Sequence, residues 1–225
     1  MSKGTMAKDT IDGSGNLGVA KNANQYGIQM IDLTLRGKEG SLLCIHRFAE
    51  KAKQEIRDKQ QKKKVEKKGE RFPNLEFEAC KYLDDKHREC VPITAIKKAL
   101  ISAATAMADL TKVGLRQAIF VGVAGDKSAA LCPIELFNGK PAVAVFDPVK
   151  SEDAVTIGIN TRGLTYRPKY EEWQLRVTIE YNPRIVSEEQ LLGLVDQAGW
   201  GVGICEGRPE RSSALGWGRF ERLAS

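Results

Sequence analysis

Long hydrophobic runs are missing from this sequence of 225 residues. No stretch approaches the ~20 consecutive apolar residues that cross a bilayer, and the first 25 residues lack the apolar segment of a signal peptide. We therefore expect a cytoplasmic protein, in the host cytoplasm if a phage encodes it, with no membrane partner.

Histidine is also scarce, because only His46 and His87 are present. A histidine-based acid-base site would have to use one of them, and His46 beside Arg47 is the candidate catalytic residue that we name. The P-loop, G-x-S-x-G and H-E-x-x-H motifs are all absent. We leave enzymatic activity open and favour a protein that is not an enzyme.

The cysteines do not form a pattern that points to disulfides or to a metal. They are five in number and scattered, which fits reduced thiols. Cys80, His87 and Cys90 have a C-x6-H-x2-C spacing but lack the paired C-x2-C knuckle of strong zinc sites. We expect no metal and no cofactor.

Positive charge, by contrast, is concentrated in one segment. Residues 51–71 hold ten Lys and Arg against four Asp and Glu, an excess equal to the whole formal charge of +6. Such a patch is typical of proteins that bind phosphate backbones, and a solvated lysine-rich helix face is the alternative. The candidate nucleic-acid-binding residues here are Lys62, Lys63, Lys64, Lys67 and Lys68.

The patterning divides the chain into an arm and one domain. Residues 1–25 hold almost no large apolar side chains and are predicted to be a flexible arm. The domain covers residues 26–225, with a basic inserted segment at about 49–90, part of which has the composition of an exposed helix. Within the insertion, residues 74–90 are ambiguous, because Leu75, Phe77 and Ala79 alternate as in a strand.

The clearest helix is predicted over residues 92–111. Pro92 stands at its first turn, and apolar residues such as Ile96 and Leu100 follow at helical spacing. Lys97 and Lys98 project near its start, where unsatisfied backbone N–H groups favour phosphate. We count both lysines among the nucleic-acid-binding candidates.

Several short stretches are β-branched or aromatic and are separated by Gly, Asp and Pro. Residues 116–123, 130–136, 141–149 and 154–159 are predicted as strands. The turn-rich segment 160–172 then interleaves positive charge with tyrosine, which is typical of surfaces that bind single-stranded nucleic acid. Its candidate residues are Arg162, Tyr166, Arg167 and Lys169, and the alternative is a surface loop whose tyrosines pack on the core.

The last third predicts a regular order of elements. Residues 173–182 alternate as a strand, Ser187 caps a helix that ends at Gly199, and residues 199–205 and 216–223 are predicted as two further strands. This β-α-β-β order is half of a ferredoxin-like fold, and the earlier elements supply the other half. The predicted fold class is α+β: a ferredoxin/RRM-like antiparallel sheet with helices on one face.

The glycine-rich end carries further binding candidates. Gly201 and Gly203 permit close approach of a ligand, and arginine fits phosphates or guanine edges in forked pairs. The arginine candidates are Arg208, Arg211 and Arg219. In the alternative, Trp200 and Trp217 are core residues and the glycines only make bulges.

Two of these segments carry a family resemblance. Val91, Pro92, Ile96, Lys97, Ala99 and Leu100 resemble the helix start of the RAMP superfamily, the RRM-like subunits that line guide RNA in CRISPR effector complexes. The closing segment resembles a group of phage and prophage proteins through Gly201, Gly203, Glu206, Arg208, Pro209 and Glu210, followed by Gly216, Trp217, Gly218, Arg219 and Phe220. The resemblance implies that the helix start and the glycine-rich loop lie along RNA and that an inserted thumb reaches a neighbouring subunit.

The expected function is therefore binding of single-stranded RNA or DNA by a phage-type protein that forms a filament along the strand. Its partners would be the nucleic acid, further copies of the chain as a homo-oligomer, or CRISPR-type effector proteins. An alternative is a protein-interaction module, such as a CRISPR-interfering mimic or a virion assembly component. A third is a metal-independent ribonuclease at His46, because some RAMP-like enzymes use a histidine with Lys or Tyr helpers.

Overall fold

The computed structural model describes residues 27–47, 56–58, 60–61, 72–145, 152–157, 161–211 and 215–223. The predicted arm lies outside these residues, and so does the lysine cluster of Lys62, Lys63, Lys64, Lys67 and Lys68. Among the described residues, no helix is long and apolar enough to cross a membrane.

The centre of the molecule is an antiparallel sheet. Its strand order is β11-β1-β10-β4, and β6 pairs with the start of β10. These strands are β1 (Gln29–Gly37), β4 (Ile119–Val123), β6 (Glu135–Leu136), β10 (Trp173–Tyr181) and β11 (Phe220–Arg222). The fold is therefore mixed α+β with antiparallel sheets.

The alternation along β10 gives this sheet one apolar face. Leu175, Val177 and Ile179 are buried, whereas Arg176 between them is exposed. In the observed register Val177 lies opposite Leu33 of β1 and Val123 of β4, so apolar side chains form a row across three strands. The strand predicted over residues 173–182 is confirmed.

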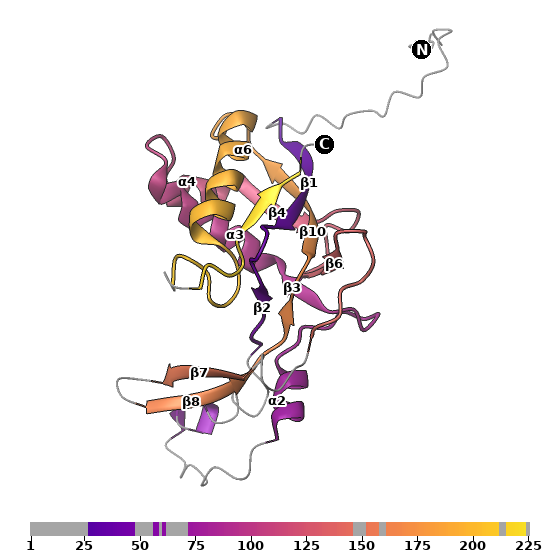
Figure 1. Ribbon diagram of the computed structural model, residues 1–225. Helices are drawn as coiled ribbons and strands as arrows, with labels where there is room; N and C mark the ends of the chain where they lie inside the picture. The colour runs from indigo at the N-terminus through magenta and orange to yellow at the C-terminus, as the bar shows by residue number, and fades with distance from the viewer. Residues whose placement is uncertain are drawn as a thin grey trace, which may run out of the picture.

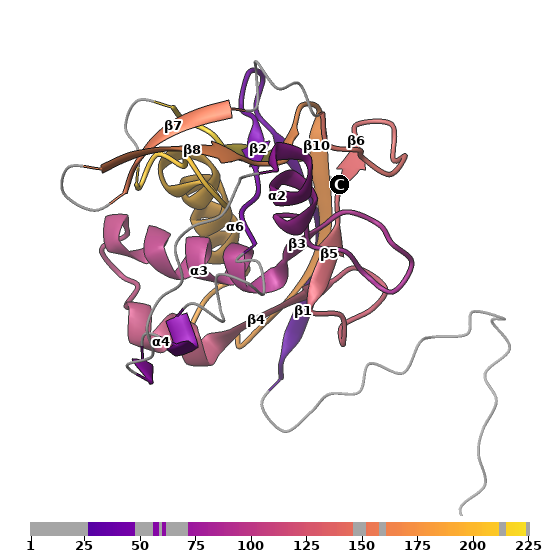
Figure 2. The same cartoon turned by 90° about the horizontal axis from the view of Figure 1, so that it is seen from below.

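The helices cover this apolar face (Figures 1 and 2). They are α3 (Ile93–Ala103), α4 (Lys112–Ala118) and α6 (Glu188–Gln197). Ile96 and Leu100 of α3 and Leu191 and Leu194 of α6 are fully buried in the same core as the strands. The helix α6 begins as predicted, with Ser187 as its N-cap.

The single helix predicted over residues 92–111 is instead interrupted. The helix α3 ends at Ala103 and is followed by a 3-10 turn, η1 (Ala104–Ala106). The next helix, α4, begins at Lys112, because the Thr111 hydroxyl accepts a hydrogen bond from the Gly114 N–H at 3.1 Å. Residues 116–118, predicted as the start of a strand, therefore belong to α4.

Residues 199–205 do not form the predicted strand. They continue α6 as a π-helical turn, η2 (Ala198–Val202), and then form a loop. The glycine at position 199 permits this, because a Cβ there would overlap the carbonyl oxygen of Phe220 in β11. Residues 141–145, in the stretch predicted as a strand over 141–149, make only isolated bridges at Pro141 and Val145.

A hairpin and a short helix extend beyond the central sheet. The strands β7 (Glu152–Ile157) and β8 (Thr161–Tyr166) pair with each other and lie beside α2 (Pro73–Ala79), as Figures 1 and 2 show. The helix α2 resolves the ambiguity for residues 74–79, because Pro73 favours its first turn over a strand, while residues 80–89 form turns and an isolated bridge between Leu83 and Glu89. The predicted loop over 160–172 is mostly strand, since β8 is followed by β9 (Lys169–Tyr170).

Short strand pairs complete the fold. The strand β9 pairs with β2 (Leu43–Cys44), and β3 (Cys90–Pro92) pairs with β5 (Leu131–Pro133). The last residue of β3, Pro92, is also the N-cap of α3, so this pair fixes where that helix begins.

Candidate functional site

A cleft of about 440 Å³ lies where the start of α3 meets the glycine-rich segment after α6. Four parts of the chain line it: the residues after β2, Tyr82 between α2 and β3, the start and one side of α3, and the segment that follows α6 through residue 211. Its lining includes Ile45, His46, Tyr82, Pro92, Thr94, Ala95, Lys98, Ser102, Gly203, Glu206, Arg208, Glu210 and Arg211. The structure therefore brings together candidates that the sequence places more than 100 positions apart.

The first turn of α3 is open toward the cleft. Pro92 is the N-cap in an extended conformation, and the Ile93 N–H donates to the carbonyl oxygen of Ala130 at 3.0 Å. Thr94 and Ala95 follow on the cleft wall, and no side chain caps this helix end. The positive end of the helix dipole is thus available to an anion in the cleft.

The loop opposite is folded back on itself. Gly203 has a φ of 71°, and a Cβ there would lie 2.9 Å from Cδ of Pro209 and 3.0 Å from Cβ of Arg208. The Arg208 guanidinium donates to the carbonyl oxygen of Cys205 at 2.9 Å and to Glu210 at 3.3 Å. Gly203 is therefore needed for the compact loop that places Arg208 at the rim.

A contact between side chains joins this loop to α3. The Ser102 hydroxyl donates a hydrogen bond to Oε1 of Glu210, and this bond lowers the pKa of the Glu210 carboxyl, with a smaller contribution from Arg208. Glu210 is thus ionised at neutral pH and neutralises Arg208. The two walls of the cleft are held together at this point.

Two cations of the cleft take part in no ion pair among the described residues, although the Arg211 charge helps to lower the pKa of the nearby Glu210 carboxyl. Arg208 is paired with Glu210, and Arg167, behind the lining, has its Nη1 3.4 Å from Oε2 of Glu206. Lys98 and Arg211 are both exposed, and within the described residues no ion pair engages either side chain. An anion entering the cleft would meet these two charges first.

His46 lies in the same cleft. Its Nδ1 is 3.9 Å from Oε1 of Glu206. Burial and the nearby Arg167 guanidinium lower the pKa of His46 below its ordinary value of 6.5, while Glu206 acts in the opposite direction. The imidazole is therefore neutral at pH 7 and adds no positive charge there, although it could accept a proton.

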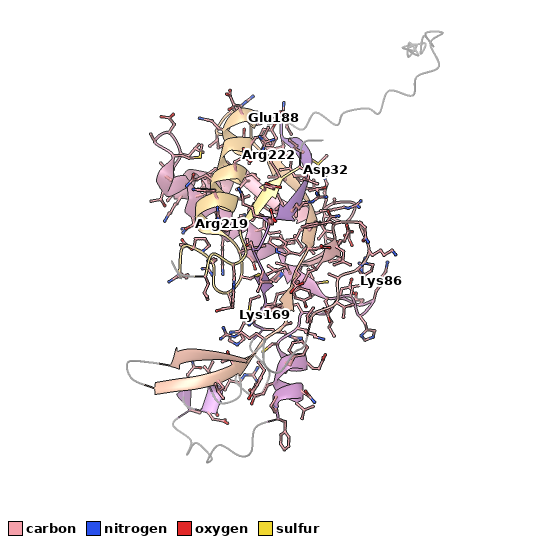
Figure 3. All side chains as sticks on the ribbon, viewed as in Figure 1. Asp32, Lys86, Lys169, Glu188, Arg219 and Arg222 are labelled. Carbon is pink, nitrogen blue, oxygen red and sulfur yellow. The ribbon has the colours of Figure 1, made fainter. Side chains whose placement is uncertain are left out.

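Other predicted residues do not line this cleft. Lys169 is only 8% exposed and its Nζ lies 4.9 Å from the centroid of the Trp217 ring, at the junction with the β7–β8 hairpin (Figure 3). Arg167 is engaged with Glu206, and Tyr166 is half-buried. The side chain of Arg162 lies outside the described part of the chain.

Trp200 lies at the surface, whereas the alternative interpretation of the sequence placed it in the core. Trp200, in η2, is 61% exposed. Its ring lies between two cations, with Cζ of Arg219 at 4.3 Å and Nζ of Lys38 at 5.0 Å from the ring centroid. Gly201 follows it in the π-helical turn, where a Cβ would lie 3.1 Å from Nε2 of Gln197.

The spacing considered for zinc has no metal-site geometry. Within the described residues no group of His, Cys, Asp and Glu side chains could hold a metal ion. Cys90 is buried and its thiol donates to the carbonyl oxygen of Arg88 at 3.2 Å, while His87 occupies a turn with a φ of 58°.

Sequence reasoning missed two cations near the cleft. Lys112 and Arg116 are exposed on α4, one turn apart. They line a hollow together with Thr94, Lys98 and Ser102 of α3, which also line the cleft. They were hidden in a segment predicted partly as strand. The available signal was Thr111, a good N-cap residue, directly before Lys112.

Comparison with protein-family models finds none that matches this chain, and comparison with curated proteins finds no match either.

Proposed function

We propose that this protein binds single-stranded nucleic acid in the cleft between α3 and the loop over residues 203–211. The observation that supports this most is the convergence of Lys98 and Arg211, two exposed cations without an ion pair among the described residues, beside an uncapped helix start. They come from the start of α3 and from the glycine-rich loop, and the sequence predicted phosphate binding for each of these segments for a different reason. Backbone N–H groups and cations at one place are what a phosphate group requires.

The size of the cleft favours a single strand over a duplex. A volume of about 440 Å³ lies within the range of about 300–1,000 Å³ that holds small molecules. One unit of a flexible strand could enter it, whereas a duplex would contact only the rim. Trp200, exposed between Arg219 and Lys38, offers a ring face on which a base could stack nearby.

We further propose that the central sheet is a ferredoxin-like fold of the RRM type. In support, α3 and α4 lie between β1 and β4 in the chain, and α6 lies between β10 and β11. The strand order β11-β1-β10-β4 also supports a β-α-β-β-α-β arrangement, which would be interrupted by the segments that form α2 and the β7–β8 hairpin. Kinship with the RAMP superfamily is part of the same proposal and rests on the motifs given above.

The test is fluorescence anisotropy with labelled single-stranded RNA, single-stranded DNA and duplex DNA at about 50 and 200 mM salt. We expect a single strand to bind most tightly, with affinity that falls steeply between the two salt concentrations. Replacing Lys98 and Arg211 together with alanine should weaken binding about tenfold and reduce the slope of log K against log salt by about 1.4, since each phosphate contact contributes about 0.7.

A matched control removes the same charge elsewhere. Lys86 and Lys140 are exposed, and neither lines the cleft. In Figure 3, Lys86 lies at the right of the molecule and Arg219 at the left. The Lys86→Ala/Lys140→Ala variant should bind like the wild type. Equal weakening by the control, or absence of binding by the wild type at 50 mM salt, would contradict the proposal and favour a protein partner instead.

A second candidate function is metal-independent cleavage of RNA. It is favoured by one observation, namely that His46 lines the same cleft as Lys98 and Tyr82 and is neutral at pH 7. Incubating the labelled RNA with protein in excess EDTA tests it on a denaturing gel. Cleavage that disappears in His46→Ala would support it, and intact RNA after prolonged incubation would remove it.

A further inference from the structure

A second hollow lies on the other side of the same helix. It has a volume of about 460 Å³ between α3 and α4, and it shares Thr94, Lys98 and Ser102 with the cleft. These three residues recur every four positions and so form one stripe along α3. The stripe is the ridge that separates the two cavities, and Lys98 stands in its middle.

The hollow is lined by cations without acids. Lys97, Lys98, Lys112 and Arg116 contribute four positive charges, and no Asp or Glu is among the described residues that line the cavity. Neither α3 nor α4 contains an acidic residue that could offset these charges along the helix. Among the described residues, no ion pair engages any of the four cations.

The hollow also has apolar walls. Ile101 lies in its lining, and the Lys97 ammonium lies 4.4 Å from the centroid of the Phe120 ring, which holds that side chain at the edge of the cavity. The aliphatic stems of the lysines add further apolar surface. A ligand that combines negative charge with apolar rings or sugars is complementary to this lining.

We propose that the hollow binds the continuation of the strand held in the cleft. The nucleic-acid strand would run from Arg211 in the cleft, across α3 over the Thr94–Lys98–Ser102 ridge, to Lys112 and Arg116 in the hollow. This inference rests on the proposed function. It adds the route that the nucleic acid takes over the surface and the minimum length of nucleic acid that can occupy both cavities. Because the crossing spans a helix of about 10–12 Å diameter, a dinucleotide cannot occupy both ends and a strand of 12 nucleotides can.

The experiment compares three variants, each of which removes two positive charges, on ligands of two lengths. Lys112→Ala/Arg116→Ala should weaken binding of a 12-nucleotide single strand about tenfold and reduce its salt slope by about 1.4. The same variant should leave binding of a dinucleotide, measured by competition, within about twofold of the wild type. Lys98→Ala/Arg211→Ala should weaken both ligands, and Lys86→Ala/Lys140→Ala neither. Both lysine-arginine pairs are exposed, so an unchanged urea midpoint confirms that each variant is folded.

The outcomes separate this inference from the proposed function. If Lys112→Ala/Arg116→Ala binds the 12-nucleotide strand like the wild type while Lys98→Ala/Arg211→Ala does not, the path over α4 is wrong and the cleft remains. If the wild type binds neither single-stranded RNA nor DNA at 50 mM salt, both proposals fall. Equal losses in the α4 variant and in Lys86→Ala/Lys140→Ala would show a nonspecific effect of charge and would also overturn the path.

Discussion

Gly218 and Gly207 hold the closing loop in a conformation that other residues rarely adopt. Their φ values are 66° and 67°. A Cβ at Gly207 would overlap the ring of Trp217, and one at Gly218 would overlap the carbonyl oxygen of Ile204. These glycines are thus required by the close packing of the loop against itself, and they set the position of Arg208 indirectly.

We expect Gly218→Ala to destabilise the protein much more than Gly40→Ala. Both positions have a positive φ, so both variants carry the strain of a left-handed alanine, about 1–2 kcal/mol. Only Gly218 adds an overlap, because no atom of the described residues lies within 4 Å of a Cβ at Gly40. The overlap should add about 2 kcal/mol or more to the loss in free energy of unfolding, measured in urea. Equal losses would show that packing at Ile204 is not tight.

The lowered pKa of His46 predicts a dependence of stability on pH. In the unfolded chain His46 takes up a proton near its ordinary pKa of 6.5, whereas in the folded protein it does so only at lower pH. The contribution of His46 is therefore complete above pH 6.5 and is lost as the pH falls toward the folded pKa. The free energy of unfolding should drop more between pH 7 and 5.5 in the wild type than in His46→Gln. The same drop in both proteins would contradict this.

At the scale of elements, the helix α6 is closed at its start by a capping box. The Ser187 hydroxyl accepts from the Gln190 N–H at 3.1 Å, and the Gln190 side chain accepts from the Ser187 N–H at 3.0 Å. Ser187→Ala should lower the free energy of unfolding by about 1 kcal/mol, and Ser187→Thr should retain most of the stability that the cap contributes. A threonine variant as unstable as the alanine variant would show that the cap contributes little.

The elements that could be predicted are those with a clear periodicity or a cap. The strand β10, with its strict alternation, and α6, with Ser187, were both found from the sequence. The residues after α6 were not, because Gly-Trp-Gly-Val-Gly alternates like a strand but bends into η2 through tertiary contact with Phe220. A local pattern does not contain that contact.

The candidate site could be predicted in part for a similar reason. Lys98, Arg208 and Arg211 were named from local charge and glycine, and the structure places them on one cleft. Arg167 and Lys169 were named by the same logic, yet Glu206 and Trp217 engage them from other elements. Whether a cation is available depends on such distant neighbours, and charge patterning along the chain does not reveal them.

At the scale of the whole molecule, the thiols report on global unfolding. Cys44, Cys90 and Cys132 are at most 1% exposed, and burial raises the pKa of Cys132 and of Cys205 to about 12 and that of Cys90 to about 11. At pH 8 we expect these thiols to react with iodoacetamide roughly a hundredfold or more slowly in the native protein than in urea, because the thiolate is the reactive form.

Mass spectrometry after timed labelling measures this for each cysteine. Cys80, which is less buried than Cys44, Cys90 and Cys132, serves as an internal comparison and should be labelled before these three. Rapid native labelling of Cys132 would mean that the sheet and helices open without global unfolding.

The pairing of β1 with β10 determines when the protein can fold during translation. Leu33 lies opposite Val177, so the central strand of the sheet has no β10 partner until the ribosome has synthesised residue 181. At about 5–20 residues per second, this interval lasts roughly 8 to 30 seconds. During that time Leu33 and Leu35, both buried in the finished protein, leave the ribosome exposed to water. The yield of this protein in a cell should therefore depend on chaperones that shield the nascent chain.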